Sequence, residues 1–343
     1  QNFYKNKKIL ITGSSGFVGS WLSTTLYEMG ASLYGISLEP NTSPNLFKLL
    51  NLEDKIKQKY IDICEFNKLN SAIKEISPDI VFHLAAQPLV RESYVKTIET
   101  FNTNVIGTLN VLESCKNLDT NVNFICITTD KCYENNEFGE RFIESDPMGG
   151  KDPYSASKAC TEILTKSHAF SFNALKLCTA RAGNIIGGGD WAKDRIITDI
   201  VESIEHTKDI VLRSPNAIRP WQHVIDVVNG YLKLAIYNED KKDLFDSFNF
   251  GPQEENEIDV KTLTNKFISN WSSCNSNVVI DNNENLPESK ILRLDSSKAK
   301  HILNWEPLMD IDTAIKETAV WYENFFLKKE IYELTIEQIN KYL

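Results

Sequence analysis

The sequence predicts an α/β protein built on a doubly wound parallel sheet, with a smaller mixed α/β lobe in its C-terminal half. Short apolar runs alternate with helical patterns up to about residue 180, which is typical of stacked βαβ units. A glycine-rich turn stands between the first run and the first helical pattern. Beyond residue 180 the alternation becomes irregular. We therefore expect a domain of Rossmann type over residues 1–180 and a second lobe mainly over residues 181–343, with late segments free to return to the first domain.

Six strands are expected in the first domain. The first of them, Lys8–Thr12, is a short β-branched run typical of a buried parallel strand. The other five are expected at Ala31–Leu38, Tyr60–Ile63, Asp79–Leu84, Val122–Thr128 and Leu175–Ala180. Helices are expected over Thr97–Leu118 and Tyr154–Ser171, and the Asn-rich stretch Asn282–Asn285 is expected to be a solvated loop. Because ligands of such sheets bind beyond the carboxyl ends of the strands, the residues that follow each strand are the candidates for a site.

The turn after the first strand has the glycines of a dinucleotide-binding loop. Gly13 suits a tight turn, Gly16 lets the backbone approach a pyrophosphate, and Gly19 lets the following helix lie close to the sheet. The helix N-terminus adds free amides and a positive dipole. The spacing is one residue longer between the first two glycines than in the common fingerprint, so that pattern fits only approximately. A plain strand-to-helix turn is the alternative, but the order of strand, glycines and helix favours a dinucleotide site.

Composition and charge exclude several classes of protein. The chain has 343 residues, of which 42% are hydrophobic and 24% charged, as in a soluble enzyme. Its net charge of −10 disfavours a nucleic-acid or anionic-membrane surface. Neither an apolar run of about 18 residues nor a signal-peptide pattern is found, so we expect a cytoplasmic protein. The seven cysteines are odd in number and lack a C-x-x-C spacing, so they are interpreted as reduced, buried thiols without a metal site.

A second motif supplies candidate acid–base chemistry. Tyr154 and Lys158 lie four residues apart near the start of a predicted helix, and so on one helical face. A free tyrosine has a pKa of about 10 and is a poor base at neutral pH. An ammonium about 4 Å away, at an effective dielectric constant near 20, contributes roughly 4 kcal/mol and would lower that pKa by about 3. Such pairs are common on surface helices, and it is the upstream glycine turn that makes this one a candidate active site.

Together these residues resemble the extended short-chain dehydrogenase/reductase family, in its NAD-dependent epimerase/dehydratase group, over nearly the whole chain. Within the family, two strings resemble the CDP-glucose 4,6-dehydratases and are far more specific than the glycine turn: Thr129–Tyr133 and Gly187–Trp191. The full set of strings that carry the likeness is Ser37–Pro40, His83–Arg91, Thr128–Asn135, Ala180–Asn184, Gly187–Trp191 and Arg219–His223.

The resemblance implies a lyase that removes water from a CDP-sugar through an internal redox cycle, in deoxysugar and lipopolysaccharide biosynthesis. Tyr154, assisted by Lys158 and Thr129, would remove the proton of the 4-hydroxyl. Asp130 would protonate the departing 6-hydroxyl and Lys131 would be the base at C5. In dTDP-glucose 4,6-dehydratases a glutamate holds the position of Lys131, whereas a lysine must first lose a proton. Burial and two nearby cations, Lys158 and the oxidised nicotinamide, would lower the pKa of Lys131. Alternatively, Lys131 only orients Asp130 or the substrate.

The cofactor implied by the resemblance is NAD. The fold expects an acid that binds the ribose at the end of the second strand, but Ser37 stands there, with Glu39 two residues later. Because a serine does not repel a 2′-phosphate, NADP is not excluded. Asp62 would accept from the adenine amino group or only neighbour a helix N-cap. The expected cofactor contacts are Gly13, Ser15, Gly16, Phe17, Val18, Ser37, Asp62, Ile63, Leu84, Ala85, Ala86, Gln87, Thr128, Tyr154 and Lys158.

A nucleotide diphosphate needs local positive charge in a chain of net charge −10. Arg195 and Arg219 are the candidates for bidentate phosphate contacts, with Asn184 as a further donor. Thr129 and His223 complete the expected substrate contacts, unless His223 only stands at the start of a helix. Trp191, in the second lobe, either covers the site or fills the core between the lobes.

Assembly and alternative functions stay open at this level. The helices Thr97–Leu118 and Tyr154–Ser171 commonly form a dimer interface in the family, so a homodimer is expected, but their apolar stripes would equally suit packing on their own sheet. A 4-epimerase or reductase of a nucleotide sugar would keep Tyr154 and Lys158 but would not need Asp130 and Lys131, and a 4,6-dehydratase of another nucleotide sugar is a further alternative. A non-catalytic dinucleotide sensor is a third interpretation, disfavoured by the intact Thr129, Tyr154 and Lys158.

Overall fold

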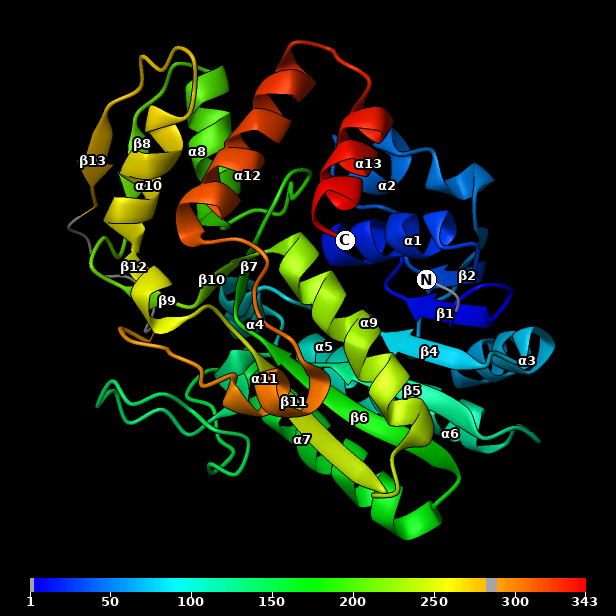
Figure 1. The fold of residues 1–343 in the computed structure, drawn as a ribbon. Helices are drawn as coiled ribbons and strands as arrows, with labels where there is room; N and C mark the ends of the chain where they lie inside the picture. Colours follow the sequence, from blue (N-terminus) through cyan, green and yellow to red (C-terminus); the bar gives the residue numbers. More distant parts are fainter. Residues whose placement is uncertain (1–2, 282–288) are drawn as a thin grey trace.

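One parallel sheet forms the centre of the computed structural model, which describes residues 3–281 and 289–343 (Figure 1). Its seven strands follow the order β11-β6-β5-β4-β1-β2-β3, and every neighbouring pair is parallel. They span Lys8–Thr12 (β1), Ser32–Ser37 (β2), Lys57–Tyr60 (β3), Ile80–His83 (β4), Val122–Ile127 (β5), Leu175–Ala182 (β6) and Phe245–Phe250 (β11). The predicted doubly wound α/β fold is confirmed. The loop expected at Asn282–Asn285 lies outside the described residues.

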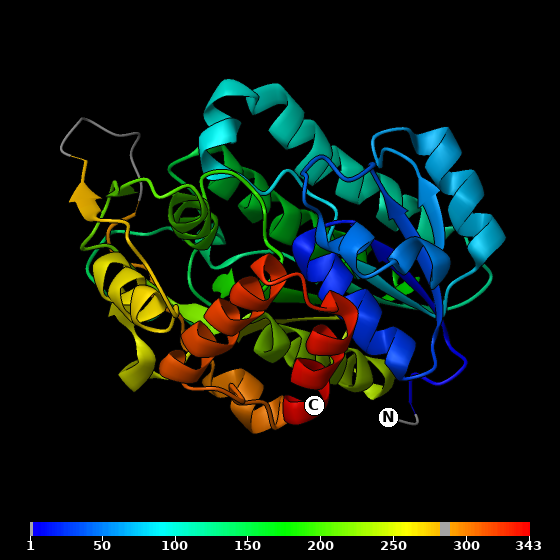
Figure 2. The same cartoon turned by 90° about the horizontal axis from the view of Figure 1, so that it is seen from above.

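Helices cover both faces of this sheet (Figure 2). α1 (Phe17–Glu28) and α9 (Val224–Asp240) pack on one face, and α3 (Phe66–Ile76), α6 (Thr108–Lys116) and α7 (Pro153–Phe172) on the other. Side chains of a strand alternate between its two faces. Along β1, Ile9 and Ile11 therefore belong to the first hydrophobic core, on the face covered by α1 and α9, and Leu10 belongs to the second core, on the opposite face. The shorter helical segments are α2 (Leu46–Leu49), η1 (Leu52–Asp54), α4 (Val90–Val95), α5 (Thr97–Phe101), η2 (Asn102–Gly107), η3 (Asp130–Cys132), η4 (Glu254–Asn256) and α11 (Ser297–Leu303).

Five of the six predicted strands match β1, β2, β4, β5 and β6 to within two residues at each end. The third was wrong, because β3 ends at Tyr60, where the predicted strand began. β3 lies at the edge of the sheet, pairs only with β2 and is partly exposed, so it carries no continuous apolar run. The apolar residues that suggested a strand follow its end, where Ile63 packs against the second core.

The helix predicted over Thr97–Leu118 is interrupted by η2, a π-helical segment. In this wider turn Asn104 accepts from the backbone N–H of Gln87 at 2.8 Å and donates to Ser157 Oγ at 2.8 Å. These contacts link the carboxyl end of β4 to α7. A periodicity argument cannot detect such a bulge, because it changes only the phase of the apolar pattern.

Within the described residues, the second lobe is built from three two-stranded sheets and four helices, most of which lie in the left half of Figure 1. Its strands are β7 (Asn184–Ile186), β8 (Ile210–Leu212), β9 (Ile218–Arg219), β10 (Trp221–His223), β12 (Ile258–Asp259) and β13 (Val278–Ile280), paired as β7–β10, β8–β13 and β9–β12. Its helices are α8 (Ile196–Glu205), α10 (Val260–Ser269), α12 (Ile311–Phe326) and α13 (Ile331–Tyr342). α9 and β11 come from the same sequence range but add to the central sheet, so the proposed boundary near residue 180 separates the lobes only in part.

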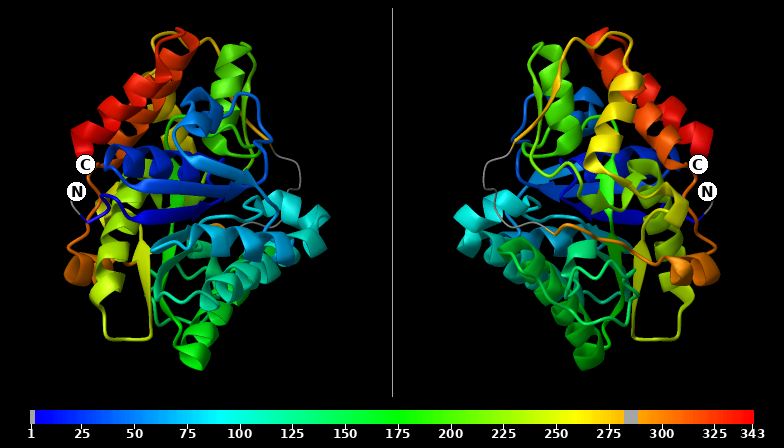
Figure 3. Two further views of the ribbon diagram at one scale, coloured as in Figure 1. Left: turned by 90° about the vertical axis from the view of Figure 1, so that its right-hand side faces the viewer. Right: turned by 90° about the vertical axis from the view of Figure 1, so that its left-hand side faces the viewer.

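The segment Gly187–Trp191 joins the two lobes. A Cβ on Gly188 would lie 2.0 Å from the ring of Trp321, and Trp21 Nε1 donates to the Gly188 carbonyl at 3.0 Å. Trp191 is buried between the rings of Tyr322 and Phe325, at centroid distances of 5.1 and 5.0 Å. The ring contacts of Trp191 are with residues 322, 325 and 326 of the second lobe, and Trp191 does not line the pocket described below, so the structure supports core packing over a covering role. α13 then packs beside α1 (Figure 3).

All seven cysteines lie in the described residues and have free thiols. Cys115, Cys126, Cys132 and Cys178 are buried, as expected, whereas Cys160 is exposed. Within residues 3–281 and 289–343, no three His, Cys, Asp or Glu side chains form a group that could hold a metal ion. In the same residues, no helix combines the length and apolarity needed to cross a membrane.

Candidate active site

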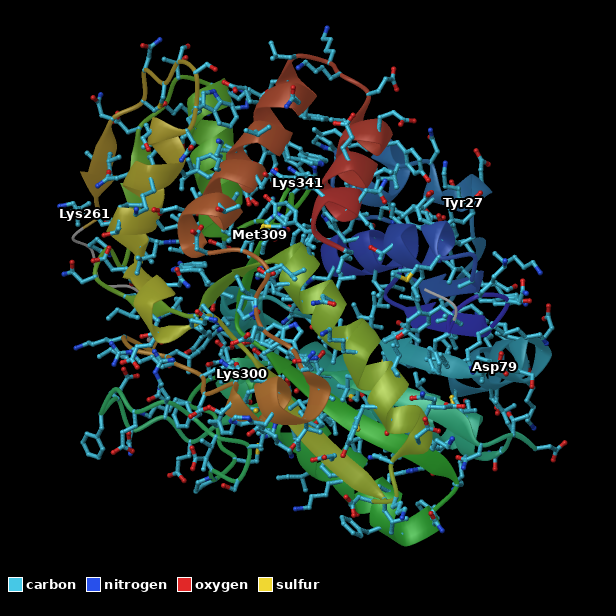
Figure 4. The ribbon with its side chains drawn as sticks, viewed as in Figure 1. Tyr27, Asp79, Lys261, Lys300, Met309 and Lys341 are labelled. Atoms are coloured by element: carbon cyan, nitrogen blue, oxygen red, sulfur yellow. The ribbon has the colours of Figure 1, made fainter. Side chains whose placement is uncertain are left out.

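The amino ends and the carboxyl ends of the central strands differ in whether they could bind a ligand. At the amino ends of the strands, Asp79 Oδ2 accepts from the backbone N–H of Lys8 at 2.8 Å and ties the ends of β1 and β4 together (Figure 4). At the carboxyl ends, the chain leaves β1 through Gly13, which has φ +74°. A Cβ on Gly13 would lie 2.8 Å from the backbone nitrogen of Ala85, and one on Gly19 would lie 2.2 Å from the Gly13 carbonyl oxygen. The turn therefore requires glycine at both positions.

This turn fits the pyrophosphate of a dinucleotide. α1 begins after Gly16, and no side chain caps its N-terminus, so the first amides of the helix are free of side-chain acceptors. Ser15 Oγ donates to the Leu38 carbonyl at 2.9 Å and so links the turn to the end of β2. Phe17 points toward the second lobe, with its ring about 3.1 Å from the position that a Cβ of Gly187 would occupy.

The other expected cofactor residues follow the carboxyl ends of β2, β3, β4 and β5, along the same edge. Ser37 Oγ donates to the Leu38 carbonyl at 2.8 Å and accepts from Gln58 Nε2 at 2.9 Å, so its hydroxyl is already used within the chain. Asp62 Oδ1 accepts from the backbone N–H of Cys64 at 2.8 Å, in the turn before α3. These contacts within the chain do not test whether Ser37 and Asp62 bind the nucleoside, so both roles stay predictions.

The expected catalytic residues come together from two elements. Thr129, Asp130 and Lys131 follow β5, and Tyr154 and Lys158 lie on α7, which Asp152 caps through its side chain. Asp130 is fully buried, and its Oδ1 accepts from Thr129 Oγ1 at 2.9 Å and from Lys131 Nζ at 3.0 Å. Within the described residues, Asp130 Oδ2 has no hydrogen-bond partner. A buried carboxyl oxygen without a partner is costly unless it serves a ligand or carries a proton.

The electrostatics of the tyrosine differ from the expectation. Burial raises the pKa of Tyr154 to about 12, against the opposing effects of Arg195 and of a hydrogen bond with Thr129. Burial also lowers the pKa of Lys158, whose ammonium donates to the Ile127 carbonyl at 3.2 Å. The expected lowering of the tyrosine pKa by Lys158 was therefore wrong for this state of the protein. Desolvation of the phenolate outweighs the neighbouring cations, a term that spacing along a helix does not contain.

Three of the expected substrate residues line one pocket of about 140 Å³ in the second lobe: Asn184, Arg195 and Arg219. Asn184 Oδ1 also accepts from Lys131 Nζ at 3.1 Å, so the pocket adjoins the catalytic residues. Arg195 stands at the N-terminus of α8 and acts electrostatically on Tyr154. Arg219 is buried, with Nη1 donating to the carbonyls of Ile218 and Lys290.

His223 does not line this pocket. It is fully buried, its Nδ1 accepts from the backbone N–H of Ile225 at 3.3 Å, and it caps α9. Its ring lies against Trp21, and burial lowers its pKa to about 4. The structure thus gives His223 the helix-start role that was the alternative to substrate contact.

A group of ion pairs in the pocket was missed by the sequence reasoning. Arg213 contacts Asp194 at 2.6 Å and Asp199 at 3.2 Å, and Arg91 reaches Asp194 from the first domain at 3.5 Å. Asp194, Asp199 and Arg213 line the pocket. The segment His83–Arg91 is one of those that resemble the family, but nothing in the spacing of Asp194, Asp199 and Arg213 indicates that these side chains meet.

Fold and site together have the features of an extended short-chain dehydrogenase/reductase: a glycine turn at the edge of a parallel sheet, beside a buried tyrosine and lysine. The chain belongs to the family described as GDP-mannose 4,6 dehydratase, whose model matches residues 10–318.

Two curated relatives illustrate the range of similarity. A CDP-glucose 4,6-dehydratase of Salmonella typhimurium is 39% identical over an alignment that covers 100% of this chain and 98% of the relative. A dTDP-D-glucose 4,6-dehydratase of Homo sapiens is 27% identical and is covered to 93%, against 95% of this chain.

Solved structures share the fold at lower identity. An epimerase of Methanothermobacter thermautotrophicus superposes with a TM-score of 0.82 at 23% identity, covering 94% of each chain. A dTDP-glucose 4,6-dehydratase of Bacillus anthracis, solved in complex with NAD, has a TM-score of 0.79 at 20% identity, covering 95% of this chain and 99% of that one.

Proposed function

We propose that this protein is an NAD-dependent CDP-glucose 4,6-dehydratase, which removes water from CDP-D-glucose to give CDP-4-keto-6-deoxy-D-glucose. The single observation that carries the proposal is that Asp130, Lys131 and Asn184 form one hydrogen-bonded group beside the pocket. An epimerase needs the tyrosine and lysine of α7, but has no use for a second acid–base pair. The 39% identity to a CDP-glucose 4,6-dehydratase over the full chain supports the same activity and the same nucleotide.

The residues present fit NAD, with the turn Gly13–Gly19 at its pyrophosphate and Tyr154 and Lys158 at its nicotinamide end. When bound there, NAD would supply a hydride acceptor for sugar C4 and, once reduced, the hydride for C6, so that no reduced cofactor would accumulate. The choice of NAD over NADP rests on Glu39, an exposed carboxylate just beyond β2 that would repel a 2′-phosphate.

Tyr154 is the proposed base for the 4-hydroxyl. Tyr154 is buried and hydrogen-bonded with Thr129, so a sugar hydroxyl brought beside it would meet a preoriented acceptor. The phenol must lose its proton before it can act. Arg195 favours that loss, and the positive charge of the oxidised nicotinamide acts in the same direction.

Asp130 and Lys131 are the proposed acid and base of the elimination. Oxidation at C4 acidifies the hydrogen at C5, so a base at C5 and an acid at the 6-hydroxyl complete the loss of water. Asp130 Oδ1 is occupied by two donors, which leaves Oδ2 to carry the proton that the departing hydroxyl needs. Lys131 must first pass on a proton, and the Asp130 carboxylate, 3.0 Å from Nζ, is the acceptor beside it, so one transfer gives both the neutral base and the protonated acid. The alternative, that Lys131 only orients Asp130, is compatible with the same contacts.

Arg195 and Arg219 are the proposed contacts of the CDP diphosphate. Both line the pocket, and a guanidinium offers two parallel donors to phosphate oxygens. Asn184 uses its oxygen for Lys131, which leaves its amide N–H groups as donors toward the pocket.

The proposal is tested by incubating the purified protein with CDP-glucose and catalytic NAD, and following the sugar nucleotide by mass spectrometry. Loss of one water without net reduction of NAD is the expected result. UDP-, dTDP- and GDP-glucose and NADP are compared in parallel. Turnover of another nucleotide in preference to CDP would overturn the base assignment, and a product of unchanged mass but inverted C4 would indicate an epimerase.

We also propose that the protein is a cytoplasmic homodimer that serves deoxysugar and lipopolysaccharide synthesis. Support for the dimer comes from apolar side chains exposed on neighbouring helices: Ile98 on α5 is 79% exposed, and Ile163 and Phe170 on α7 are 58% and 60% exposed. Such a patch on one side of a protein is typical of an interface. Light scattering is expected to give twice the chain mass of 39.0 kDa, and Phe170→Glu is expected to give the monomer.

A further inference from the structure

Glu162 continues the line of Tyr154 and Lys158 on α7. The three residues are spaced by four, so they lie on one face of the helix. Glu162 is 2% exposed, and glutamate is almost never buried to this extent without partners. Neither the proposed chemistry nor the proposed binding of substrate and cofactor uses this carboxylate.

The contacts of Glu162 join three elements behind the site. Thr128, at the end of β5, donates its hydroxyl hydrogen to Glu162 Oε1. Thr179 Oγ1 and Arg181 Nη2, both on β6, donate to Glu162 Oε2 at 2.8 Å each. Thr128 is the residue before Thr129, so this carboxylate anchors the point from which the proposed catalytic turn leaves the sheet.

Glu162 also acts electrostatically on Lys158, which lies four residues before it on α7. Within the described residues, the titratable groups coupled to Lys158 are His83 on β4, Cys126 on β5, Cys132 on η3 and Glu162 on its own helix. Burial lowers the pKa of His83 to about 3, and raises the pKa of Cys126 to about 12 and that of Cys132 well above its usual value. All three are therefore neutral near pH 7, and Glu162 is the one charged group of this set.

We propose that Glu162 is a positioning residue for the active site. Its hydrogen bond to Thr128 holds the turn of Thr129 against α7, and its negative charge keeps Lys158 in the ammonium form. The alternative is a purely structural role, in which Glu162 only neutralises Arg181 through an ion pair. Nη1 of Arg181 also donates to Tyr133 Oη and to the Glu144 carbonyl. That alternative predicts a loss of stability but no change in the ionisation of Lys158.

Glu162→Gln separates charge from shape. The new amide oxygen can still accept from Thr179 and Arg181, while its N–H donates to Thr128 Oγ1. The Thr128 hydroxyl can then turn to the Ala180 carbonyl, which lies 3.3 Å away. The variant therefore keeps the hydrogen-bond pattern but leaves Lys158 without its counter-charge. The pKa of Lys158 falls, so the protein loses the ammonium at a lower pH.

The experiment measures the pH dependence of two quantities in wild type, Glu162→Gln and Glu162→Asp: the dissociation constant of NAD, and turnover of CDP-glucose. In Glu162→Gln the alkaline limb of both profiles is expected about one pH unit lower, which means about tenfold weaker NAD binding above that limb. Glu162→Asp keeps the charge but is shorter, so its limb stays in place while turnover falls about tenfold at every pH. Glu337→Gln, an exposed change on α13, is the matched control and is expected to leave both profiles unchanged.

Equal losses in both variants without any shift of the alkaline limb would overturn the proposal in favour of the ion-pair alternative. If Glu162→Gln does not fold, Glu162→Asp still decides the positioning role, which unchanged turnover would contradict. The turnover arm rests on the proposed function, whereas the NAD arm does not. A wild-type protein that binds NAD but leaves CDP-glucose unchanged therefore rejects the substrate and not the role of Glu162.

Discussion

The turn after β1 and the turn after β5 both lie at the carboxyl ends of the central strands, but different groups determine their structures. The first, Gly13–Gly19, depends mainly on backbone, and Gly13 and Gly19 are required because a Cβ on either would strike neighbouring backbone. The second, Thr128–Lys131, depends on polar side chains, of which all but that of Lys131 are buried, and these are held by residues from β6, β7 and α7. A phosphate needs only close amides, whereas proton transfer needs side chains with controlled ionisation.

The two turns also differ in which amino-acid substitutions they tolerate. In the first turn a side chain is an obstacle, and the energy of a substitution is set by local sterics. In the second turn each side chain is a partner in a network, so the effect of a substitution spreads to groups on other elements. Variants in the two turns should therefore fail in different measurements: cofactor binding for the first, turnover and its pH dependence for the second.

The largest effect is expected for Tyr154→Phe, which removes the proposed base beside the second turn. Turnover should fall about 10³-fold, because a positioned general base contributes about 10² to 10⁴. The dissociation constant of NAD should change less than threefold, roughly, because the first turn is untouched. Steady-state kinetics and calorimetric titration with NAD check the two halves. A variant that keeps a tenth of the activity would remove Tyr154 from its proposed role.

Lys131→Ala is expected to lower turnover about 10²-fold, because it removes the proposed base at C5. Oxidation at C4 does not need this residue, so the variant should accumulate reduced cofactor when mixed with substrate in a single turnover. Lys131→Arg discriminates between the two interpretations of Lys131. An arginine stays charged and cannot act as a base, but it can still orient Asp130. Substantial activity in Lys131→Arg would therefore favour the orienting role.

Gly13→Ala tests whether the first turn acts through sterics. A matched control is Gly30→Ala, since Gly30 has φ +79° but its Cβ would come no closer than 3.6 Å to another group. The left-handed backbone costs both variants about 1–2 kcal/mol of unfolding free energy. Only Gly13→Ala meets backbone, at 2.8 Å, so it should be less stable than the control and should bind NAD at least about tenfold more weakly. Thermal unfolding and NAD titration measure both. Equal behaviour of the two variants would argue against a steric origin.

The smallest effects are expected from single hydroxyls. Thr128→Val removes a donor to buried Glu162 and should cost about 1 kcal/mol of unfolding free energy and a few-fold in turnover. Ser15→Ala removes an exposed hydroxyl that donates to the Leu38 carbonyl, and should cost less than about 0.5 kcal/mol. Denaturant unfolding of both variants provides the measurement. A larger loss from Ser15→Ala would show that side chains matter in the first turn too.

Thr129, Asp130 and Lys131 were proposed as catalytic from a resemblance, whereas the sequence alone predicted the fold class, five strands of the sheet, the glycine turn and the pair Tyr154 and Lys158. These features are local: an apolar run, a glycine spacing or an i, i+4 pair records its own structure in consecutive residues. Asn184, Arg195 and Arg219 were predicted to contact a substrate diphosphate because of its charge and not from spacing, and the structure brings all three to one pocket.

Only the tertiary structure decided how these residues are held. Edge strand β3, the π-helical turn at Asn102–Gly107 and the return of β11 to the sheet depend on neighbours that are remote in sequence. The same is true of the pKa of Tyr154, which is set by desolvation, and of His223, which caps a helix and does not line the pocket. The partners of Glu162 lie 17 to 34 residues from it. Burial and long-range contact carry no signature in a single sequence, because they arise only when separate elements pack together.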